Sequence, residues 1–277
     1  MPELPEVEYG RKLAETICTG KRITKITCED DAIVFEKRSP KEWERALLHR
    51  RVLDVCRRGK YIWFALDQRP WPLFHFGMTG AFRTPSQPTI QLEAGPAITS
   101  TEWPPRFTKW CITLEDGMQL AMTNARRLGR ARLIDDPNTD PTIARLGFDP
   151  LTHMPPLPEF ATLVSQRRGA LKGLLLNQSF AAGVGNWIAD EVLYQARIDP
   201  RRSAQELSPK EVQRLHHTLE QVIQHAVSVD ADKSRFPQDW LFHHRWGKTD
   251  ATTAEGEPVE FLTVAGRTTA WVPSIQR

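Results

Sequence analysis

The apolar positions nearest the start of the chain recur at helical spacing, as Val7, Leu13 and Ile17. Pro5 suits the first turn of a helix, because its missing N–H would have no partner there. Gly20 suits the end of the same helix. The pattern predicts a helix over residues 5–20, which leaves Pro2 and Glu3 outside it and without a structural role.

A series of short strands is predicted from residue 21 to about residue 134. The runs KRITKITC, YIWFAL, PLFHFGM, KWCITL and MQLAMT are apolar or β-branched, as strands are. The last two flank a Glu-Asp-Gly turn at 115–117 and predict a hairpin. RRLGRARLI (126–134) is a second hairpin-like stretch. Several short strands after one helix favour a sandwich or a barrel.

The second half of the chain has helical patterns instead. Pro-rich and Asp-rich sequence over residues 135–158 marks a linker region. Further on, Ser208 and Glu211 form a capping box, and an apolar stripe continues to about residue 228. The chain is therefore predicted to have a β-rich half and an α-rich half.

Residues 170–196 predict two helices around a small-residue turn that could bind an anion. Gly183 and Gly185 permit positive φ and a close backbone approach. Free N–H groups in a turn that precedes a helix attract phosphate. A plain helical hairpin is the alternative, but Lys172 before the turn and Asn186 at its end favour a phosphate site.

Composition narrows the class of protein without naming a function. The 277 residues are 40% apolar, which excludes a disordered chain, and no apolar run has the length of a membrane span. The start lacks the layout of a signal peptide. The four cysteines lie far apart and predict neither a disulfide framework nor a zinc site. We expect an intracellular protein with reduced thiols.

Four stretches together resemble a known family. MPELPEVE (1–8), RRGKY (57–61), HFGMTG (75–80) and LNQSFAAGVGN (176–186) are similar, in order and in spacing, to motifs of the Fpg/Nei family of formamidopyrimidine-DNA glycosylases. The resemblance spans nearly the whole chain. It implies excision of oxidised bases from damaged double-stranded DNA, followed by strand cleavage at the abasic site, by an enzyme that works as a monomer, without a cofactor and away from membranes.

The resemblance also implies an α+β fold of several parts. Bacterial members carry a four-cysteine zinc finger, whereas this chain has no cysteine after Cys111. Its end, FLTVAGRTTAWVPSIQR, resembles the zincless β-hairpin finger of plant and fungal members, so no metal is expected and the location in a eukaryote would be the nucleus. His243 and His244 are expected to be structural. The expected parts are an N-terminal helix plus β-sandwich catalytic domain (1–134), a linker region (135–158), a helix–two-turn–helix DNA-binding domain (159–230) and the zincless finger (231–277).

The catalytic residues implied by the resemblance cluster at the start of the chain. If Met1 is removed, Pro2 presents a secondary amine, and an α-amino group titrates near about 8, so part of it is unprotonated at neutral pH. Attack of this amine on the sugar C1′ would give an iminium (Schiff base) and then β,δ-elimination. Glu3 would be the general acid, Glu6 would organise the site, and Lys60 would bind a phosphate next to the lesion.

The DNA contacts implied by the resemblance lie further along the chain. Lys172 and Asn186 would hold phosphates, Glu191 would contact the site or the damaged base, and Arg267 would insert at the phosphate of the flipped nucleotide.

A flipped base leaves a gap in the stack that must be filled. Met78 would be one wedge, and Arg126 and Leu128 would form the intercalation loop. Leu128 replaces the usual phenylalanine and Ala125 the usual proline, which weakens stacking and puts discrimination of the opposite base in question.

Two functions of different classes remain open on the sequence alone. One is the bifunctional DNA glycosylase with lyase activity. The other is a catalytically silent nucleic-acid-binding protein that uses only its helix–two-turn–helix. Pro2 and Glu3 favour the enzyme, because a binding module has no use for them. The resemblance further implies a loop after the long helix, which covers a flipped 8-oxoguanine in bacterial members. Here that stretch looks shorter than the bacterial loop, and Pro237 and Trp240 in it suggest an early return to ordered packing.

Overall fold

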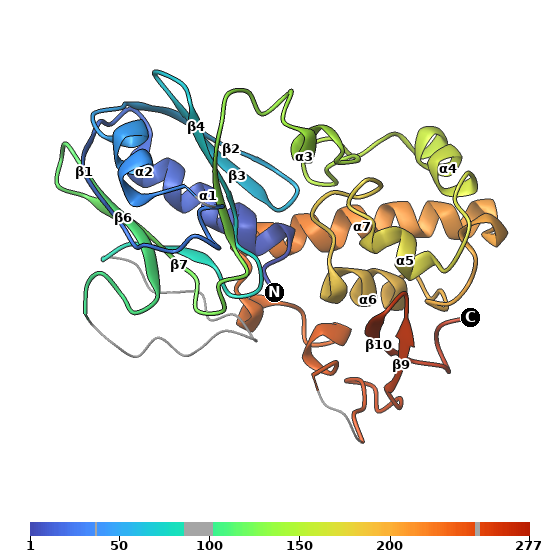
Figure 1. Ribbon diagram of the computed structural model, residues 1–277. Helices are drawn as coiled ribbons and strands as arrows, with labels where there is room; N and C mark the ends of the chain where they lie inside the picture. Colours follow the sequence, from blue (N-terminus) through green and yellow to red (C-terminus); the bar gives the residue numbers. More distant parts are fainter. Residues whose placement is uncertain (37, 86–101, 247–249) are drawn as a thin grey trace. The chain divides into compact units, whose positions relative to one another are not determined.

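The computed structural model describes residues 1–36, 38–85, 102–246 and 250–277. It divides into two compact units, Met1–Ala144 and Arg145–Arg277 (Figure 1). The division falls inside the region predicted to be a linker. That region also contains α3 (Pro141–Ala144) and the first residues of α4 (Leu157–Ser165), so it holds regular structure as well as loops.

The predicted first helix is confirmed as α1, which runs from Leu4 to Cys18. A hydrogen bond stabilises its first turn: the Glu3 backbone N–H donates to Glu6 Oε2 at 2.9 Å. Further along, α1 contacts β2 and β3 of one sheet and β5 and β7 of another. The start of the chain is thereby fixed against strands of both sheets of the first unit.

Two antiparallel four-stranded sheets make up most of the first unit, as the prediction of a sandwich requires. One has the order β1-β6-β7-β5 and the other β2-β3-β4-β8 (Figure 1). The strands of the first sheet, in that order, are Ile23–Cys28, Thr108–Leu114, Gln119–Thr123 and Ala81–Arg83. Those of the second are Val52–Arg58, Tyr61–Leu66, Trp71–His75 and Arg130–Ile134. Helix α2 is Pro40–Leu47.

The prediction of a second hairpin at residues 126–134 is wrong. Only Arg130–Ile134 forms a strand, β8, and it pairs with β4, which lies far away in sequence. Because that partner is distant, the local pattern could not indicate it. Residues 126–129 form a loop that precedes β8.

Aromatic side chains from both sheets form the centre of the first core. Phe64 and Phe74 come from β3 and β4, whereas Phe82 and Trp110 come from β5 and β6. All four are buried, and their ring centroids lie between 5.2 and 6.3 Å apart. Tilted and edge-on pairs at these distances add to the stability that comes from buried area.

The second unit is helical and ends in a two-stranded hairpin. After α4 its α-helices are α5 (Leu171–Leu176), α6 (Asn186–Gln195) and α7 (Pro209–Ser228). The short 3₁₀ helices are η1 (Ala204–Glu206), η2 (Lys233–Arg235) and η3 (Leu241–His243). The hairpin strands are β9 (Glu260–Val264) and β10 (Arg267–Trp271). Both the helix pair around 177–185 and the capping box that begins α7 were predicted.

The segment after α7 returns to ordered packing at once. Phe236 and Phe242 pack on Trp187 of α6, with ring centroids 5.6 and 5.2 Å from it, and Trp240 packs on Phe236 at 5.1 Å. This confirms the expectation drawn from Pro237 and Trp240. Residues 247 and 248, the last two of the stretch considered in the sequence, lie outside the described residues.

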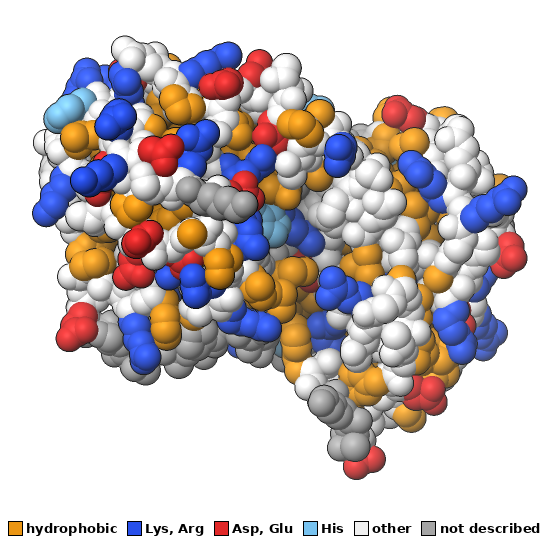
Figure 2. Space-filling view, in the orientation of Figure 1, with side chains coloured by type: hydrophobic (Ala, Val, Ile, Leu, Met, Phe, Trp, Pro, Cys, Tyr) orange, Lys and Arg blue, Asp and Glu red, His pale blue; other side chains and the backbone are white. Residues whose placement is uncertain are grey.

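Within the described residues, no helix is long and apolar enough to cross a membrane. Figure 2 shows Lys and Arg side chains spread over the visible surface of both units, with Asp and Glu among them. The face shown in Figure 2 is therefore of mixed charge.

Candidate functional site

Pro2 is buried and lines a small cavity at the start of α1. Glu6, Tyr9, Phe76 and Arg83 are among its other lining residues. The cavity measures about 20 Å³, which is room for one water molecule. Burial lowers the pKa of Arg83 to about 10, and its Nε is buried without a hydrogen-bond partner among the described residues. A positive charge therefore lies at the same cavity as Pro2.

Two carboxyl groups, those of Glu3 and Glu6, follow Pro2 closely in sequence. Glu3 is only 2% exposed. Burial, and secondly the charge of Glu3, raise the pKa of Glu6 to about 7. A carboxyl group that titrates near neutral pH can hold or release a proton under physiological conditions. The structure thus brings the three predicted residues Pro2, Glu3 and Glu6 together, with Pro2 and Glu6 on one cavity.

Lys60 lies in the two-residue turn between β2 and β3, beside a histidine that the sequence reasoning missed. Lys60 is 8% exposed, and His75 is the strand partner of Tyr61, whose ring lies 4.8 Å from the His75 ring. Burial, Lys60 and Arg130 lower the pKa of His75 to about 4. His75 is therefore neutral at pH 7. The Gly77 N–H donates to its Nδ1 at 3.1 Å, which leaves the proton on Nε2. The indication of His75 in the sequence was its position as the first residue of the motif HFGMTG.

The loop 75–80 packs backbone to backbone on the loop 124–129. A Cβ on Gly77, which has φ of +64°, would lie 2.4 Å from the Leu128 carbonyl carbon, and a Cβ on Gly129 would lie 2.9 Å from the His75 carbonyl oxygen. Glycine is required at both positions because no side chain fits between the loops. The glycines of HFGMTG and of RRLG were visible in the sequence, but their mutual contact was not.

Asn124 joins the two loops through its side-chain amide. It is fully buried, its Nδ2 donates to the Phe76 carbonyl at 3.1 Å, and its Oδ1 accepts the Leu128 N–H at 3.2 Å. Both ends of the amide are therefore occupied. Sequence reasoning missed Asn124, since a polar residue before a loop gives no sign of burial.

The three predicted intercalation residues all lie on these two loops. Met78 is half-buried, whereas Arg126 and Leu128 are exposed, Leu128 to 46%. The Arg126 N–H donates to Thr79 Oγ1 at 3.3 Å, which ties the second loop to the first. An exposed leucine that follows two arginines on a fixed loop can enter a base stack.

The turn between α5 and α6 is ordered mainly by Gln178. Its Nε2 donates to the carbonyls of Leu176 and Val184 at 2.9 and 2.8 Å, and its Oε1 accepts the Gly183 N–H at 3.1 Å. Gly183 has φ of +98°, as predicted, whereas Gly185 is extended and serves as the N-cap of α6. The start of α6 therefore lies on a preformed turn.

Lys172 is not at the surface, and its predicted phosphate contact is wrong. It is 0% exposed, and its Nζ lies 2.6 Å from Asp190 Oδ1. The same Nζ donates to Thr269 Oγ1 at 2.7 Å and to the Thr268 carbonyl at 3.1 Å. Arg245 pairs with the other Asp190 oxygen at 2.6 Å. The lysine is thus one cation of a buried ion cluster.

Glu191 is also fully buried, so the prediction that it contacts DNA is wrong for this structure. Its Oε2 accepts the Phe242 N–H at 2.7 Å, and its Oε1 accepts the Leu241 N–H at 3.3 Å and Gln195 Nε2 at 2.8 Å. Burial raises its pKa to about 7. The side chain holds η3 onto α6. The position of Glu191 in the motif could not distinguish this structural role from a contact with DNA.

Arg267 and Asn186 are brought together at the C-terminal hairpin. Ala265 and Gly266, with φ of +50° and +71°, form the two-residue turn, and the exposed Arg267 begins β10 directly after it. Asn186 Nδ2 donates to the carbonyl of Thr268, the next residue, at 2.9 Å. No cluster of His, Cys, Asp or Glu within the described residues could hold a metal ion.

Two models of protein domains match most of the chain. Residues 1–131 match the model of the formamidopyrimidine-DNA glycosylase N-terminal domain, and residues 146–238 match the helix–two-turn–helix domain of the same glycosylases. A formamidopyrimidine-DNA glycosylase of Arabidopsis thaliana is 40% identical over 277 residues, covering 100% of this chain and 71% of the relative. The chain belongs to the formamidopyrimidine-DNA glycosylase family.

Other members of this glycosylase family match over their whole length. One from Thermus thermophilus is 34% identical over 291 residues and covers 100% of this chain and 98% of its own. Its crystal structure matches with a TM-score of 0.76 at 32% identity, covering 99% of this chain and 98% of that one. A structure of the Lactococcus lactis glycosylase, non-covalently bound to DNA with an abasic site, shares the fold with a TM-score of 0.81 at 23% identity, covering 99% of each chain.

Proposed function

We propose that this glycosylase excises oxidised bases from double-stranded DNA and then cleaves the strand at the abasic site, as a base excision repair enzyme. The observation that supports this most strongly is the buried Pro2, next to Glu3 in sequence and on one cavity with Glu6, in a chain of this family. Residues 1–134 would supply the chemistry. Residues 159–230 and the finger, 231–277, would hold the DNA backbone.

Removal of Met1 would free the Pro2 nitrogen, which is an amide in the intact chain. Arg83 at the same cavity disfavours a second positive charge, so it would keep the amine unprotonated and nucleophilic. The nitrogen lone pair would attack C1′, the C1′–base bond would break as the departing base takes up a proton, and the nitrogen would give up its own proton. The C1′–O4′ bond would then break as the ring oxygen is protonated, with Glu3 as the general acid for the departing base or the ring oxygen. The product is an iminium between the Pro2 nitrogen and C1′.

The iminium would then drive strand cleavage. Because the Pro2 amine is secondary, the adduct cannot lose its charge by deprotonation at nitrogen, so it withdraws electrons from C2′. Loss of a C2′ proton to a base would expel the 3′ phosphate, and a second elimination would expel the 5′ phosphate. Glu6, whose pKa is raised to about 7, is suited to relay protons at this site. Water would finally release Pro2 as a free amine.

Phosphate contacts would hold the lesion strand. Lys60 at the β2–β3 turn would provide a cation, and the neutral His75 at the end of β4 would provide an Nε2–H donor. From the second unit, Asn186 and Arg267 would contact phosphates, since the hydrogen bond from Asn186 to Thr268 sets them next to each other. Contacts of this kind fix the register of the DNA and carry no sequence information.

The two packed loops would fill the space left by the flipped nucleotide. Met78 and Leu128 are the apolar wedges, and the Arg126 side chain would pair with the orphaned base. Because both loops are fixed by Asn124 and by glycine contacts, the wedge would enter the duplex without first ordering itself. The enzyme would work as a monomer and, in a eukaryotic cell, in the nucleus.

Borohydride trapping on abasic-site DNA tests the proposal. The chain with Met1 removed should form a covalent protein–DNA adduct that maps to Pro2. Pro2→Gly, or a retained extra residue before Pro2, should abolish the adduct or reduce it sharply. A trapped peptide containing an internal lysine would contradict the mechanism. Binding of DNA without any trapping or cleavage would instead support a catalytically silent binding protein.

A further inference from the structure

Three consecutive residues of the intercalation loop are each held by a different tether. The Arg126 N–H donates to Thr79 Oγ1, and the Leu128 N–H donates to Asn124 Oδ1. Between them, Arg127 is held by its side chain, which binds Asp31 with both Nε and Nη2, each at 2.9 Å. Arg127 has φ of +53°, a conformation that costs energy in a residue with a side chain.

The surroundings of Asp31 keep its carboxylate ionised and in one position. It is 3% exposed and accepts the backbone N–H groups of Ile33 and Val34, each at 3.2 Å. Lys109 Nζ lies 3.0 Å from it and also 3.6 Å from Glu29. These donors and cations hold the pKa of Asp31 well below its usual range. The carboxylate therefore stays charged at any physiological pH.

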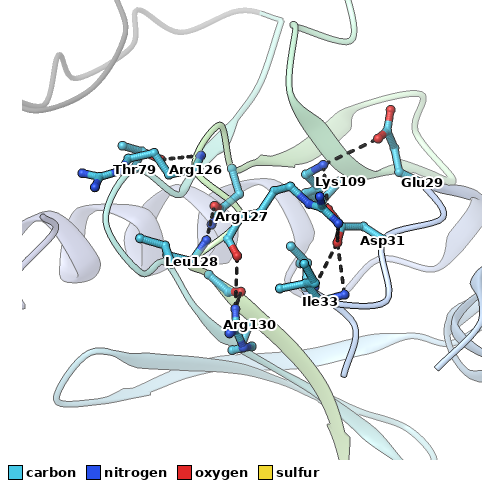
Figure 3. A network of polar contacts seen from close by, with 12 residues as sticks. Glu29, Asp31, Ile33, Thr79, Lys109, Arg126, Arg127, Leu128 and Arg130 are labelled. Carbon is cyan, nitrogen blue, oxygen red and sulfur yellow. Dashed lines mark hydrogen bonds and ion pairs between the residues drawn. The ribbon is translucent and has the colours of Figure 1, made fainter. Parts of the chain in front are cut away.

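The segment that carries Asp31 is itself joined to the far end of the loop. The Ala131 N–H at the start of β8 donates to the Val34 carbonyl at 2.8 Å. In Figure 3 the Arg127 side chain extends toward Asp31 and Lys109, whereas Arg126 and Leu128 extend to the other side. The two parallel hydrogen bonds to Asp31 fix the direction of the Arg127 side chain. Because Arg126 and Leu128 are its neighbours in the chain, their directions are fixed as well.

We propose that Asp31 is a positioning residue for the intercalation loop. By holding Arg127 against the body of the first unit, it keeps Arg126 and Leu128 projected outward as a preformed wedge. This inference rests on the proposed function, because it gives a task only to an enzyme that flips a nucleotide and fills the gap. Asp31 is not among the residues that line the Pro2 cavity.

The test compares two substrates that differ only in their need for a wedge. One is a duplex with an abasic site opposite cytosine, and the other has the same abasic site in a bulge with no opposite nucleotide. Asp31→Asn should slow borohydride trapping about tenfold or more on the first, since a misplacement of about 1 Å can cost about a hundredfold in rate. On the bulge, trapping should stay within about twofold, as for a substitution remote from the reacting groups.

A second readout follows the wedge directly. With 2-aminopurine in place of the opposite cytosine, the wild type should change the fluorescence on binding, and Asp31→Asn should reduce that change. Asp30→Asn is the matched control, because it removes the same charge from the exposed neighbour and should behave as the wild type. In an Arg127→Gln background, Asp31→Asn should cause no further slowing.

The outcomes separate the two proposals. Equal slowing on both substrates, no slowing on either, or additive effects of Asp31→Asn and Arg127→Gln would overturn the role of Asp31 while leaving the glycosylase proposal intact. A wild type that traps neither substrate would overturn the proposed function, and the inference with it.

Discussion

At the residue scale, the properties of the site come from where a few polar side chains are buried. Glu3 and Glu6 are ordinary carboxylates in sequence, yet burial and their closeness raise the pKa of Glu6 to about 7. Lys172, in contrast, resembled an exposed phosphate ligand and is buried against Asp190. The type of a residue determines which chemistry is possible, and its burial determines whether that chemistry occurs in the folded protein.

The raised pKa of Glu6 predicts a pH-dependent effect of Glu6→Gln. Because the folded-state pKa, about 7, exceeds the ordinary value of 4.5, the native state binds more protons between these values. The wild type therefore loses stability as pH rises through that window, by at most about 3 kcal/mol. A glutamine avoids this loss and can still accept the Glu3 N–H.

Thermal unfolding at pH 5 and pH 8 checks this prediction. Glu6→Gln should leave Tm nearly unchanged at pH 5 and raise it at pH 8. Glu159→Gln, at an exposed position at the start of α4, is the control and should shift Tm equally at both values. A variant less stable than the wild type at pH 8 would mean that the ionised Glu6 has a partner that stabilises it.

At the scale of elements, a buried ion cluster holds the C-terminal hairpin to the helices. Asp190 of α6 lies between Lys172 of α5 and Arg245, and it also accepts the Ala270 N–H of β10 at 3.2 Å. Lys172 in turn donates to two consecutive β10 residues. The cluster thus joins side chains that are distant in sequence and attaches the hairpin to the helices. A metal ion has the same structural role in a zinc finger.

Asp190→Asn is expected to destabilise the second unit strongly. The change leaves two buried cations without a charged partner, which costs about 3–5 kcal/mol in comparable pairs. Urea unfolding followed by tryptophan fluorescence would measure it. Asp239→Asn, which removes an exposed carboxylate of the same unit, should cost less than about 0.5 kcal/mol. Equal effects of the two substitutions, or a wild-type Tm that falls with a chelator, would contradict this account.

At the scale of the whole molecule, charge gives only a weak indication of function. The net charge is +3 from 37 basic and 34 acidic residues, and many of these are paired with each other. The site proposed for catalysis lies in the first unit, whereas Asn186 and Arg267 lie in the second. Binding of DNA would therefore depend on a few placed contacts from both units, and its affinity should fall with salt by a log–log slope of about 0.9 for each phosphate that a Lys or Arg neutralises.

The range of lesions is predicted from the segment that follows α7. Residues 236–242 pack onto α6 as an aromatic cluster and are not available to cover a flipped base. A nearly normal purine needs such a cover, whereas poorly stacked lesions need less extrusion energy and fewer reading contacts. We expect weak excision of 8-oxoguanine beside strong excision of hydantoins and ring-opened purines, with abasic-site cleavage retained.

Single-turnover rates on matched duplexes decide this prediction. Each lesion is placed opposite cytosine in one sequence, and the abasic site in that sequence is the control for binding and lyase chemistry. Release of 8-oxoguanine as fast as a hydantoin would show that another segment supplies the cover.

The elements and the chemistry available at the start of the chain could be predicted from the amino-acid sequence. Helical spacing, β-branched runs and capping residues gave α1, most strands, the helix pair around 177–185 and α7, because these depend on neighbours in sequence. The motifs likewise pointed to Pro2, Glu3 and Glu6. Only the tertiary structure decided which polar residues are buried. It removed Lys172 and Glu191 from the surface, joined the loops through Asn124, and set Arg127 against Asp31, because burial and long-range pairing depend on residues far apart in the chain.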